Sequence, residues 1–190
     1  MPPKSRITRE MITDAAVALI REEGYGAVNA RSVAGKLGCS TQPVMYHFSS
    51  MEELKREAYT AVDRLHSAYL MDITGKTDPL TEIGLSYIRF AKEEPNLFRF
   101  LFQSGYAREN SVMEMVSSPE LDGVIAAVEE ASALGEKASR EIFLTIAMFV
   151  HGYASLIAGN GLDFDEELVS SQLQNVFYGA LAAASKEEDK

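Results

Sequence analysis

Residues 29–50, NARSVAGKLGCSTQPVMYHFSS, constrain the fold more than any other stretch, because they read as two short helices joined by a tight turn. Asn29 is a preferred N-cap residue for the first helix, and Gly38 supplies the left-handed conformation that ends it. Ser40 can cap the second helix, in which Pro43 removes only a backbone N–H that has no partner within the helix. This arrangement predicts a helix-turn-helix.

The second of these helices has an expected inner and an expected outer face. Val44 and Phe48 are four residues apart and should be buried. Polar and aromatic side chains on the other face can reach base edges, thymine methyls and phosphates in a major groove. The expected DNA-contacting residues of the whole motif are Arg31, Ser32, Ser40, Thr41, Gln42, Pro43, Tyr46, His47 and Lys55. A helical protein without DNA affinity can also contain short helices broken at glycine, so the motif alone leaves both readings open.

The flanking sequence favours the helix-turn-helix. Thr8 to Glu23 carries apolar residues in paired i, i+4 steps and stops at Gly24, which predicts a helix that packs across the pair. Downstream, Ser50-Met51-Glu52-Glu53 is a capping box that opens a fourth helix, expected to run to about Met71.

The first 60 or so residues resemble the DNA-binding domain of the TetR family of one-component transcriptional regulators. The matching segments are Glu23-Gly24-Tyr25, Val33-Ala34, Leu37-Gly38, Val44 to Phe48 and Glu52-Glu53-Leu54. Residues 149–156, FVHGYASL, resemble the His-Gly segment of one subgroup of the family's ligand-binding domains.

Three positions depart from the family pattern. Met45 stands where the family usually has tyrosine, and the tyrosine follows at Tyr46. Met51 replaces a frequent lysine at the start of the fourth helix, so that only backbone N–H groups, or Lys55 one turn later, can meet a phosphate there. Met148 and Phe149 fill the region where the His-Gly subgroup usually has a tryptophan.

The resemblance implies an all-α fold of about nine helices. Residues 1–50 would form a three-helix DNA-binding domain, with a connecting fourth helix at about 51–71. Residues 72–185 would form a larger domain that binds a small-molecule effector and dimerises through its last two long helices. The function implied is that of a repressor that binds a palindromic operator as a homodimer and is released by a small apolar or aromatic effector. No resident cofactor or metal is implied.

The central helices are rich in aromatic residues and methionine, which form adaptable apolar pocket walls. The expected effector-binding residues are Phe98, Phe102, Tyr106, Met113, Phe143, Met148 and His151. Such residues at helical spacing also occur in a plain core, and His151 can equally be a satisfied interhelical histidine.

The net charge of −10 is unusual for a DNA-binding protein, but its distribution is uneven. Residues 1–66 hold nine basic and eight acidic residues, whereas residues 67–190 hold nine and twenty. The basic residues Lys4, Arg6 and Arg9 lie in or near an N-terminal arm, which places positive charge near the expected DNA face. One cysteine, Cys39, and no apolar start segment predict a cytoplasmic protein without a membrane partner.

Two other classes of function compete with this interpretation. The chain lacks the sequence signatures of a nucleophile elbow, a phosphate-binding glycine loop or a zinc-binding His-Glu-x-x-His helix, so an enzyme is not predicted. The alternative to a regulator is a helical small-molecule or partner-binding module whose N-terminal domain no longer binds DNA. Met45, Met51 and the negative net charge motivate this alternative, because each weakens DNA affinity.

Overall fold

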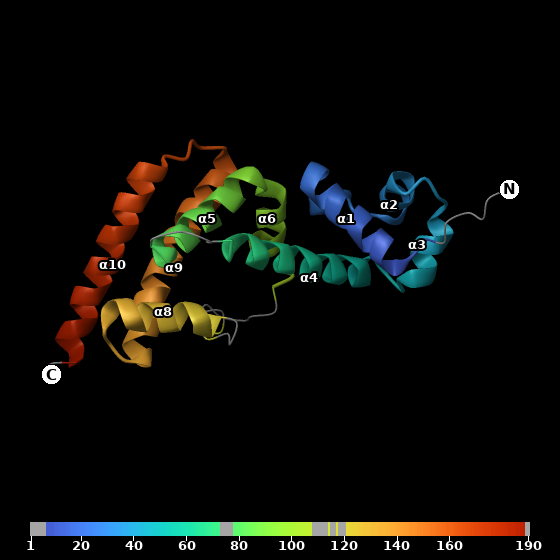
Figure 1. Cartoon of the computed structure of the whole chain (residues 1–190). Coiled ribbons are helices and arrows are strands. Elements are labelled where there is room, and N and C mark those ends of the chain that lie inside the picture. Colours follow the sequence, from blue (N-terminus) through green and yellow to red (C-terminus); the bar gives the residue numbers. More distant parts are fainter. Residues whose placement is uncertain (1–6, 73–77, 108–113, 115–116, 118–120, 189–190) are drawn as a thin grey trace. The chain divides into compact units, whose positions relative to one another are not determined.

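The computed structural model describes residues 7–72, 78–107, 114, 117 and 121–188, and it is all-α as expected (Figure 1). The described residues form nine α-helices and one short 3-10 helix. The α-helices are α1 (Arg9–Glu23), α2 (Ala30–Lys36), α3 (Thr41–His47), α4 (Met51–Leu70), α5 (Pro79–Glu93), α6 (Pro95–Gln103), α8 (Asp122–Ser132), α9 (Glu136–Asn160) and α10 (Glu166–Glu188), and the 3-10 helix η1 spans Tyr25–Ala27.

Several helices are closed by a side-chain cap or by a left-handed glycine. Thr8 caps α1 by accepting a hydrogen bond from the Met11 N–H at 3.2 Å, and Gly38 takes the left-handed conformation with φ of 63°. Gly161 ends α9 in the same way, with φ of 62°. Two glycines therefore close helices where an L side chain would be strained. The sequence Ser118-Pro119 also predicts the start of a helix that runs to about Leu134, and this start lies outside the described residues.

The chain divides into two compact units. Unit 1 comprises Met1–Ala68 together with Glu94–Ala107, and unit 2 comprises Tyr69–Glu93 together with Arg108–Lys190. Helix α6 thus belongs to the unit that contains α1–α3, although the sequence places it after the expected domain boundary.

Unit 1 has a continuous apolar core that explains its helix pattern. The fully buried side chains recur along α1–α4 with the period of a helix, so that one face of each helix is buried and the polar face is exposed. They include Ile12, Ile20, Val33, Val44, Phe48, Leu54 and Val62.

Within unit 1, helix α6 contacts the end of α1 and η1 through polar and aromatic side chains. The Asn96 side chain donates a hydrogen bond to the Arg21 carbonyl at 2.9 Å, and Arg21 pairs with Glu94 at 2.9 Å. The Phe100 ring stacks on Tyr25 at a centroid distance of 5.7 Å. The buried face of α6 therefore packs on the part of unit 1 that contains α1–α3, which we call the head. It does so through residues that are far apart in the sequence.

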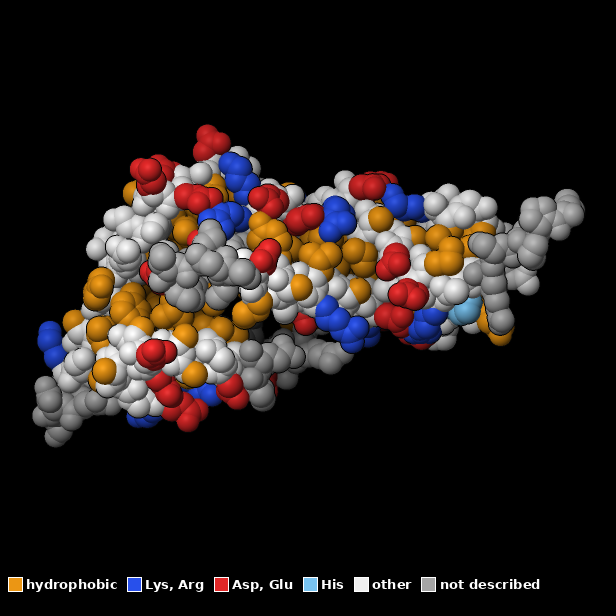
Figure 2. Space-filling view, viewed as in Figure 1, with side chains coloured by type: hydrophobic (Ala, Val, Ile, Leu, Met, Phe, Trp, Pro, Cys, Tyr) orange, Lys and Arg blue, Asp and Glu red, His pale blue; other side chains and the backbone are white. Residues whose placement is uncertain are grey.

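Unit 2 is built from α5, α8, α9 and α10. Gly84 allows α5 to approach α10 closely, because a Cβ at this position would lie 3.1 Å from the Leu173 Cδ1 atom. Arg89 on α5 pairs with Glu82 on its own helix and with Glu166 at the start of α10, both at 2.6 Å. An apolar cluster around Val128, Ile142 and Ala184 joins α8, α9 and α10, and hydrophobic side chains gather where these helices lie in Figure 2.

His66 provides a test of the packing inside unit 1. Its ring is 6% exposed and meets Phe102 edge-on at a centroid distance of 5.4 Å. Burial lowers the pKa of His66 to about 4, so the unfolded chain binds a proton at higher pH than the folded one. The His66 contribution to stability is therefore complete above about pH 6.5 and is lost as the pH falls toward 4.

We expect His66→Gln, which removes the titrating group, to flatten the fall in unfolding free energy between pH 7 and pH 5. Denaturant titrations of both proteins at several pH values measure this, and the carboxylates cancel in the difference because both proteins share them. Identical pH slopes for the two proteins would contradict the buried neutral histidine.

Candidate nucleic-acid interface

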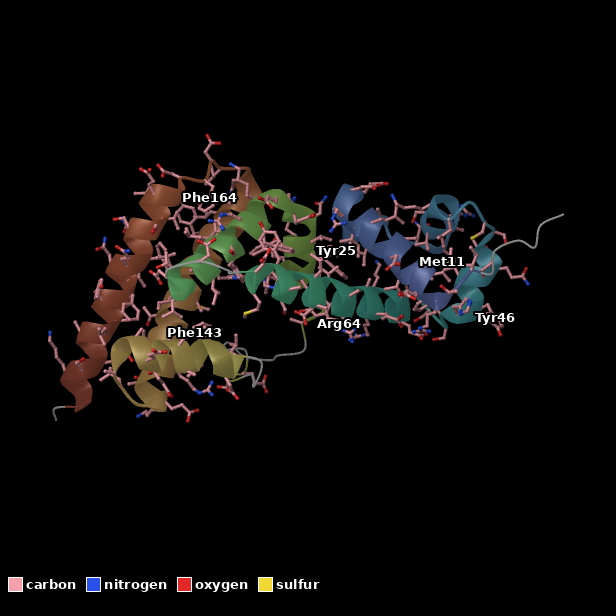
Figure 3. The ribbon with its side chains drawn as sticks, viewed as in Figure 1. Met11, Tyr25, Tyr46, Arg64, Phe143 and Phe164 are labelled. Carbon is pink, nitrogen blue, oxygen red and sulfur yellow. The ribbon has the colours of Figure 1, made fainter. Side chains whose placement is uncertain are left out.

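Helix α3 presents the face that the sequence predicts for DNA contact. Val44 and Phe48 are completely buried, and this fixes the rotation of the helix about its axis. Thr41 and Gln42 are exposed, and the Tyr46 side chain is 77% exposed and points away from the head (Figure 3). Met45 is also exposed, at 48%. A short helix with one buried apolar face and one exposed face of polar and aromatic side chains has the geometry of a recognition helix.

The turn before α3 is organised by α2. Asn29 caps α2 by accepting hydrogen bonds from the Arg31 and Ser32 N–H groups at 3.0 and 3.1 Å. The Ser32 hydroxyl completes the capping box and donates to the Ala27 carbonyl at 2.7 Å. Ser32 is thus already engaged in the cap. Ser40 precedes α3 as its N-cap residue, but its side chain makes no capping hydrogen bond and is exposed.

Arg9 is the centre of a junction between α1, α3 and α4. Its guanidinium donates to Glu53 at 2.8 Å and to Glu57 at 2.7 Å, and it covers the Phe48 ring at 4.0 Å. It also donates to the His47 carbonyl at 2.5 Å, one of the carbonyls that the end of α3 leaves without a helical partner. We call Arg9, His47, Phe48, Glu53 and Glu57 the Arg9 junction.

Electrostatics in the Arg9 junction follow from these contacts. The pKa of Glu53 falls to about 2, because the Ser49 hydroxyl and then Arg9 donate hydrogen bonds to its carboxylate. Hydrogen bonds to Glu57 and Glu53 raise the pKa of Arg9. The sequence analysis grouped Arg9 with the basic residues near the expected DNA face, whereas the structure pairs it with two carboxylates on α4.

His47 differs from the expected outward orientation. Its ring is half-buried, and the Nε2 atom lies 3.1 Å from the Ile7 carbonyl oxygen. Because a carbonyl only accepts hydrogen bonds, this nitrogen carries the proton and donates. The ring is turned this way because Ile7 lies beside the end of α3.

The cations of the head fall into two groups. Lys36 pairs with Glu22 at 2.7 Å and Arg56 pairs with Glu52 at 3.0 Å, so part of their charge is offset. Arg31 and Lys55 have no ion-pair partner among the described residues, and Arg31 is exposed. These two remain as the cations of the predicted set that can meet phosphates directly.

The predicted effector-binding residues are divided between the units. Phe98 and Phe102 lie in unit 1, with ring centroids 4.8 Å apart and Phe98 fully buried. Tyr106 is also in unit 1, where its hydroxyl donates to Glu52 in the first turn of α4 at 2.9 Å. Met113 lies outside the described residues.

Three further candidates lie in unit 2. Phe143 packs against the Val128, Ile142 and Ala184 cluster, in the region labelled in Figure 3. Met148 is 42% exposed on α9. His151 is half-buried, with its Nδ1 atom 2.9 Å from the Tyr87 hydroxyl and its Nε2 atom 3.3 Å from the Ser155 hydroxyl. Burial lowers the pKa of His151, which favours the neutral ring.

The sequence patterns do not identify the residues that contact His151 and Arg9. Tyr87 and Ser155 complete the His151 group, and Glu53 and Glu57 complete the Arg9 junction. Only the i, i+4 spacing of His151 and Ser155 gives a local signal; the other contacts join distant segments. No cluster of three His, Cys, Asp or Glu side chains suited to a metal ion occurs within the described ranges.

Comparison with known families identifies the chain. Residues 12–58 match the family described as bacterial regulatory proteins, tetR family, and residues 80–176 match the tetracyclin repressor-like C-terminal domain. The chain belongs to the TetR family. It is a DNA-binding transcriptional regulator of the helix-turn-helix type, in a family that is not one of enzymes.

Individual relatives are distant. The uncharacterized HTH-type transcriptional regulator YobS of Bacillus subtilis (strain 168) is 21% identical over 174 residues, which is 90% of each chain. Among solved structures, a TetR family member from Streptomyces coelicolor A3 is 17% identical with a TM-score of 0.60, over 91% of this chain and 98% of the other. The multidrug binding protein EbrR, complexed with ethidium, is 16% identical with a TM-score of 0.61, over 88% and 97%. These two structures support the fold.

We expect Arg9→Met to lower the melting temperature of the protein by a few degrees. The change leaves Glu53 and Glu57 side by side without their cation and leaves the His47 carbonyl without its donor. Arg64→Met is the matched control, because Arg64 is exposed and has no ion pair among the described residues. Thermal unfolding at low and high salt tests this, and equal melting temperatures for the two variants would contradict the junction.

Proposed function

We propose that this regulator is a cytoplasmic homodimeric repressor that binds a palindromic operator and is released by a small apolar or aromatic effector. The observation that carries the proposal is the outer face of α3. Burial of Val44 and Phe48 turns Thr41, Gln42 and Tyr46 outward together, as direct readout in a major groove requires. Arg31, Ser40, Pro43 and Lys55 flank this face in the proposed contact set, with Ser32 and His47 as the members already engaged within the head.

A homodimer through α9 and α10 is supported by the surface that these helices leave uncovered. Met148, Gly152 and Leu156 follow one another at four-residue steps on α9, and all three are exposed. A Cβ added at Gly152 or at Gly179 of α10 would meet no atom within 4 Å. These glycines leave room for a second backbone to approach.

The composition of α9 adds to this argument. Among the described residues it is the one helix long and apolar enough to span a membrane, and only 28% of its most apolar stretch of 18 residues is buried within the chain. A core helix of a single chain would be mostly covered. In the proposed dimer, α9 and α10 of a second copy bury this exposed apolar surface. A dimer also has two recognition helices, which can bind the two half-sites of one duplex.

The effector is proposed to bind at the expected residues of unit 2, which are Phe143, Met148 and His151. His151 is the polar member in unit 2, because its ring and the Tyr87 hydroxyl can each exchange their mutual hydrogen bond for one to a ligand. EbrR is described with ethidium, a flat aromatic cation, and this supports an aromatic effector class for the present chain. We propose the corresponding subgroup for the C-terminal domain because of the His-Gly segment around His151.

The function is tested first by selecting bound duplexes from a random DNA pool with the purified protein. An enriched palindrome, whose binding weakens with salt, is the expected result. A folded dimer that enriches no duplex would instead favour a helical binding module without DNA affinity.

On the enriched duplex, we expect Tyr46→Ala to weaken binding by about tenfold or more, the scale of one lost base or phosphate contact. Tyr46→Phe separates the hydroxyl from the ring: a loss as large as that of alanine assigns the contact to the hydroxyl. Fluorescence anisotropy measures both variants. Full DNA affinity in Tyr46→Ala would contradict the proposed outer face.

We expect Leu156→Glu to convert the dimer to monomers, because it buries a carboxylate in the proposed interface. Met71→Glu is the control, since Met71 is a similarly exposed apolar residue outside α9 and α10. Sedimentation equilibrium gives the mass of each variant. A dimeric Leu156→Glu protein would place the interface elsewhere.

A further inference from the structure

Met45 is a large apolar side chain on the recognition helix α3 that the head leaves partly uncovered. It is 48% exposed, whereas Val44 before it and Phe48 after it are completely buried. Successive residues of a helix are rotated by about 100° around its axis, because about 3.6 residues make one turn. Met45 therefore lies on one flank of α3, between the buried face and the outer face that carries Gln42 and Tyr46.

The opposite flank of α3 carries His47, which is rotated by about 200° from Met45. The Nε2 atom of His47 donates to the Ile7 carbonyl at 3.1 Å, so this ring is held against the head. The Tyr46 ring meets the His47 ring edge-on, with a centroid distance of 5.1 Å and an interplanar angle of 87°. The Tyr46 ring is thus drawn toward the His47 flank, and the other flank is left to aliphatic groups.

Thr41 is the neighbour of Met45 on this other flank. The two residues are four apart in α3, a spacing that places side chains next to each other on a helix surface. Both side chains are exposed. The methyl group of Thr41 and the thioether of Met45 therefore face the same surroundings, and we call these two residues the aliphatic flank of α3.

The chemistry of Met45 limits what it can recognise in a major groove. A thioether has no hydrogen-bond donor and accepts only weakly, so it binds neither phosphates nor the polar edges of bases well. The one apolar group that base pairs present in the major groove is the C5 methyl of thymine. An unbranched, polarizable side chain adapts readily to such a group. Burial of one methyl group changes affinity by about fourfold, which favours thymine at one position of a site.

We propose that Met45 is a specificity-determining residue, which packs on the C5 methyl of one thymine in each half-site with the Thr41 methyl beside it. The proposal rests on the DNA binding proposed above, and it deepens that function by naming a base that the recognition helix selects. In the proposed contact set, Gln42 and Tyr46 supply polar readout from the outer face, and the aliphatic flank adds apolar readout next to them.

The test replaces thymine by deoxyuridine, one position at a time and in both half-sites of the selected operator. This change removes the C5 methyl and keeps every hydrogen-bonding group of the base pair. For the unaltered protein, we expect one thymine position whose replacement weakens binding by about fourfold for each half-site. Fluorescence anisotropy measures the affinity for each duplex.

Three variants assign this effect to a side chain. Met45→Gln keeps the length of the side chain and makes it polar, so the thymine and deoxyuridine duplexes should bind equally at that position. Met45→Leu stays apolar and should retain the difference. Met71→Gln is the matched control, because Met71 is 49% exposed and lies outside α3, and it should retain the full difference. Melting temperatures close to that of the unaltered protein are expected for all three, since both positions are exposed.

A half-site in which no thymine responds to deoxyuridine would overturn the proposal and leave the proposed function intact. A deoxyuridine effect that persists undiminished in Met45→Gln would overturn it as well, because duplex shape or another side chain then causes the effect. A protein that binds no selected duplex would overturn this proposal and the proposed function together.

Discussion

The burial of Val44 and Phe48 is the constraint on which the functional reading of this protein depends. Helix α3 has seven residues, too few to persist alone in water, so its existence and its rotation come from the apolar side chains it inserts into the head. Once those two are buried, the helical period forces Thr41, Gln42 and Tyr46 to the outside together. The recognition surface is thus a consequence of core packing.

Polar contacts then lock the short helix at both ends. The capped α2 and the left-handed Gly38 set the turn that leads into α3, and the Arg9 junction closes its far end against α4. Helix α6 adds a third support, because Asn96 and Phe100 tie it to the end of α1 and to Tyr25. An effector that displaces α6 would therefore act directly on α1 and η1.

Local signals in the sequence predicted the helices and the recognition face well. Asn29, Gly38 and the Ser50-Met51-Glu52-Glu53 capping box mark helix ends through chemistry that needs no knowledge of the rest of the chain. The long-range partners were beyond such signals. Arg9 finds carboxylates 44 and 48 residues away, and Tyr106 finds Glu52 at a separation of 54, because folding brings together segments whose spacing carries no period. For the same reason the sequence listed Phe98 with His151, although the structure assigns them to different units.

The central claim is that the outer face of α3 enters the major groove of two related half-sites. Methylation interference at guanine N7, which lies in the major groove, tests it most directly on the selected duplex with the unaltered protein. The account predicts two interference patches related by the twofold axis of the palindrome, and weakening of both in Tyr46→Ala. Tight binding without interference at any N7 position would contradict it, because the protein would then hold the duplex without reading that groove.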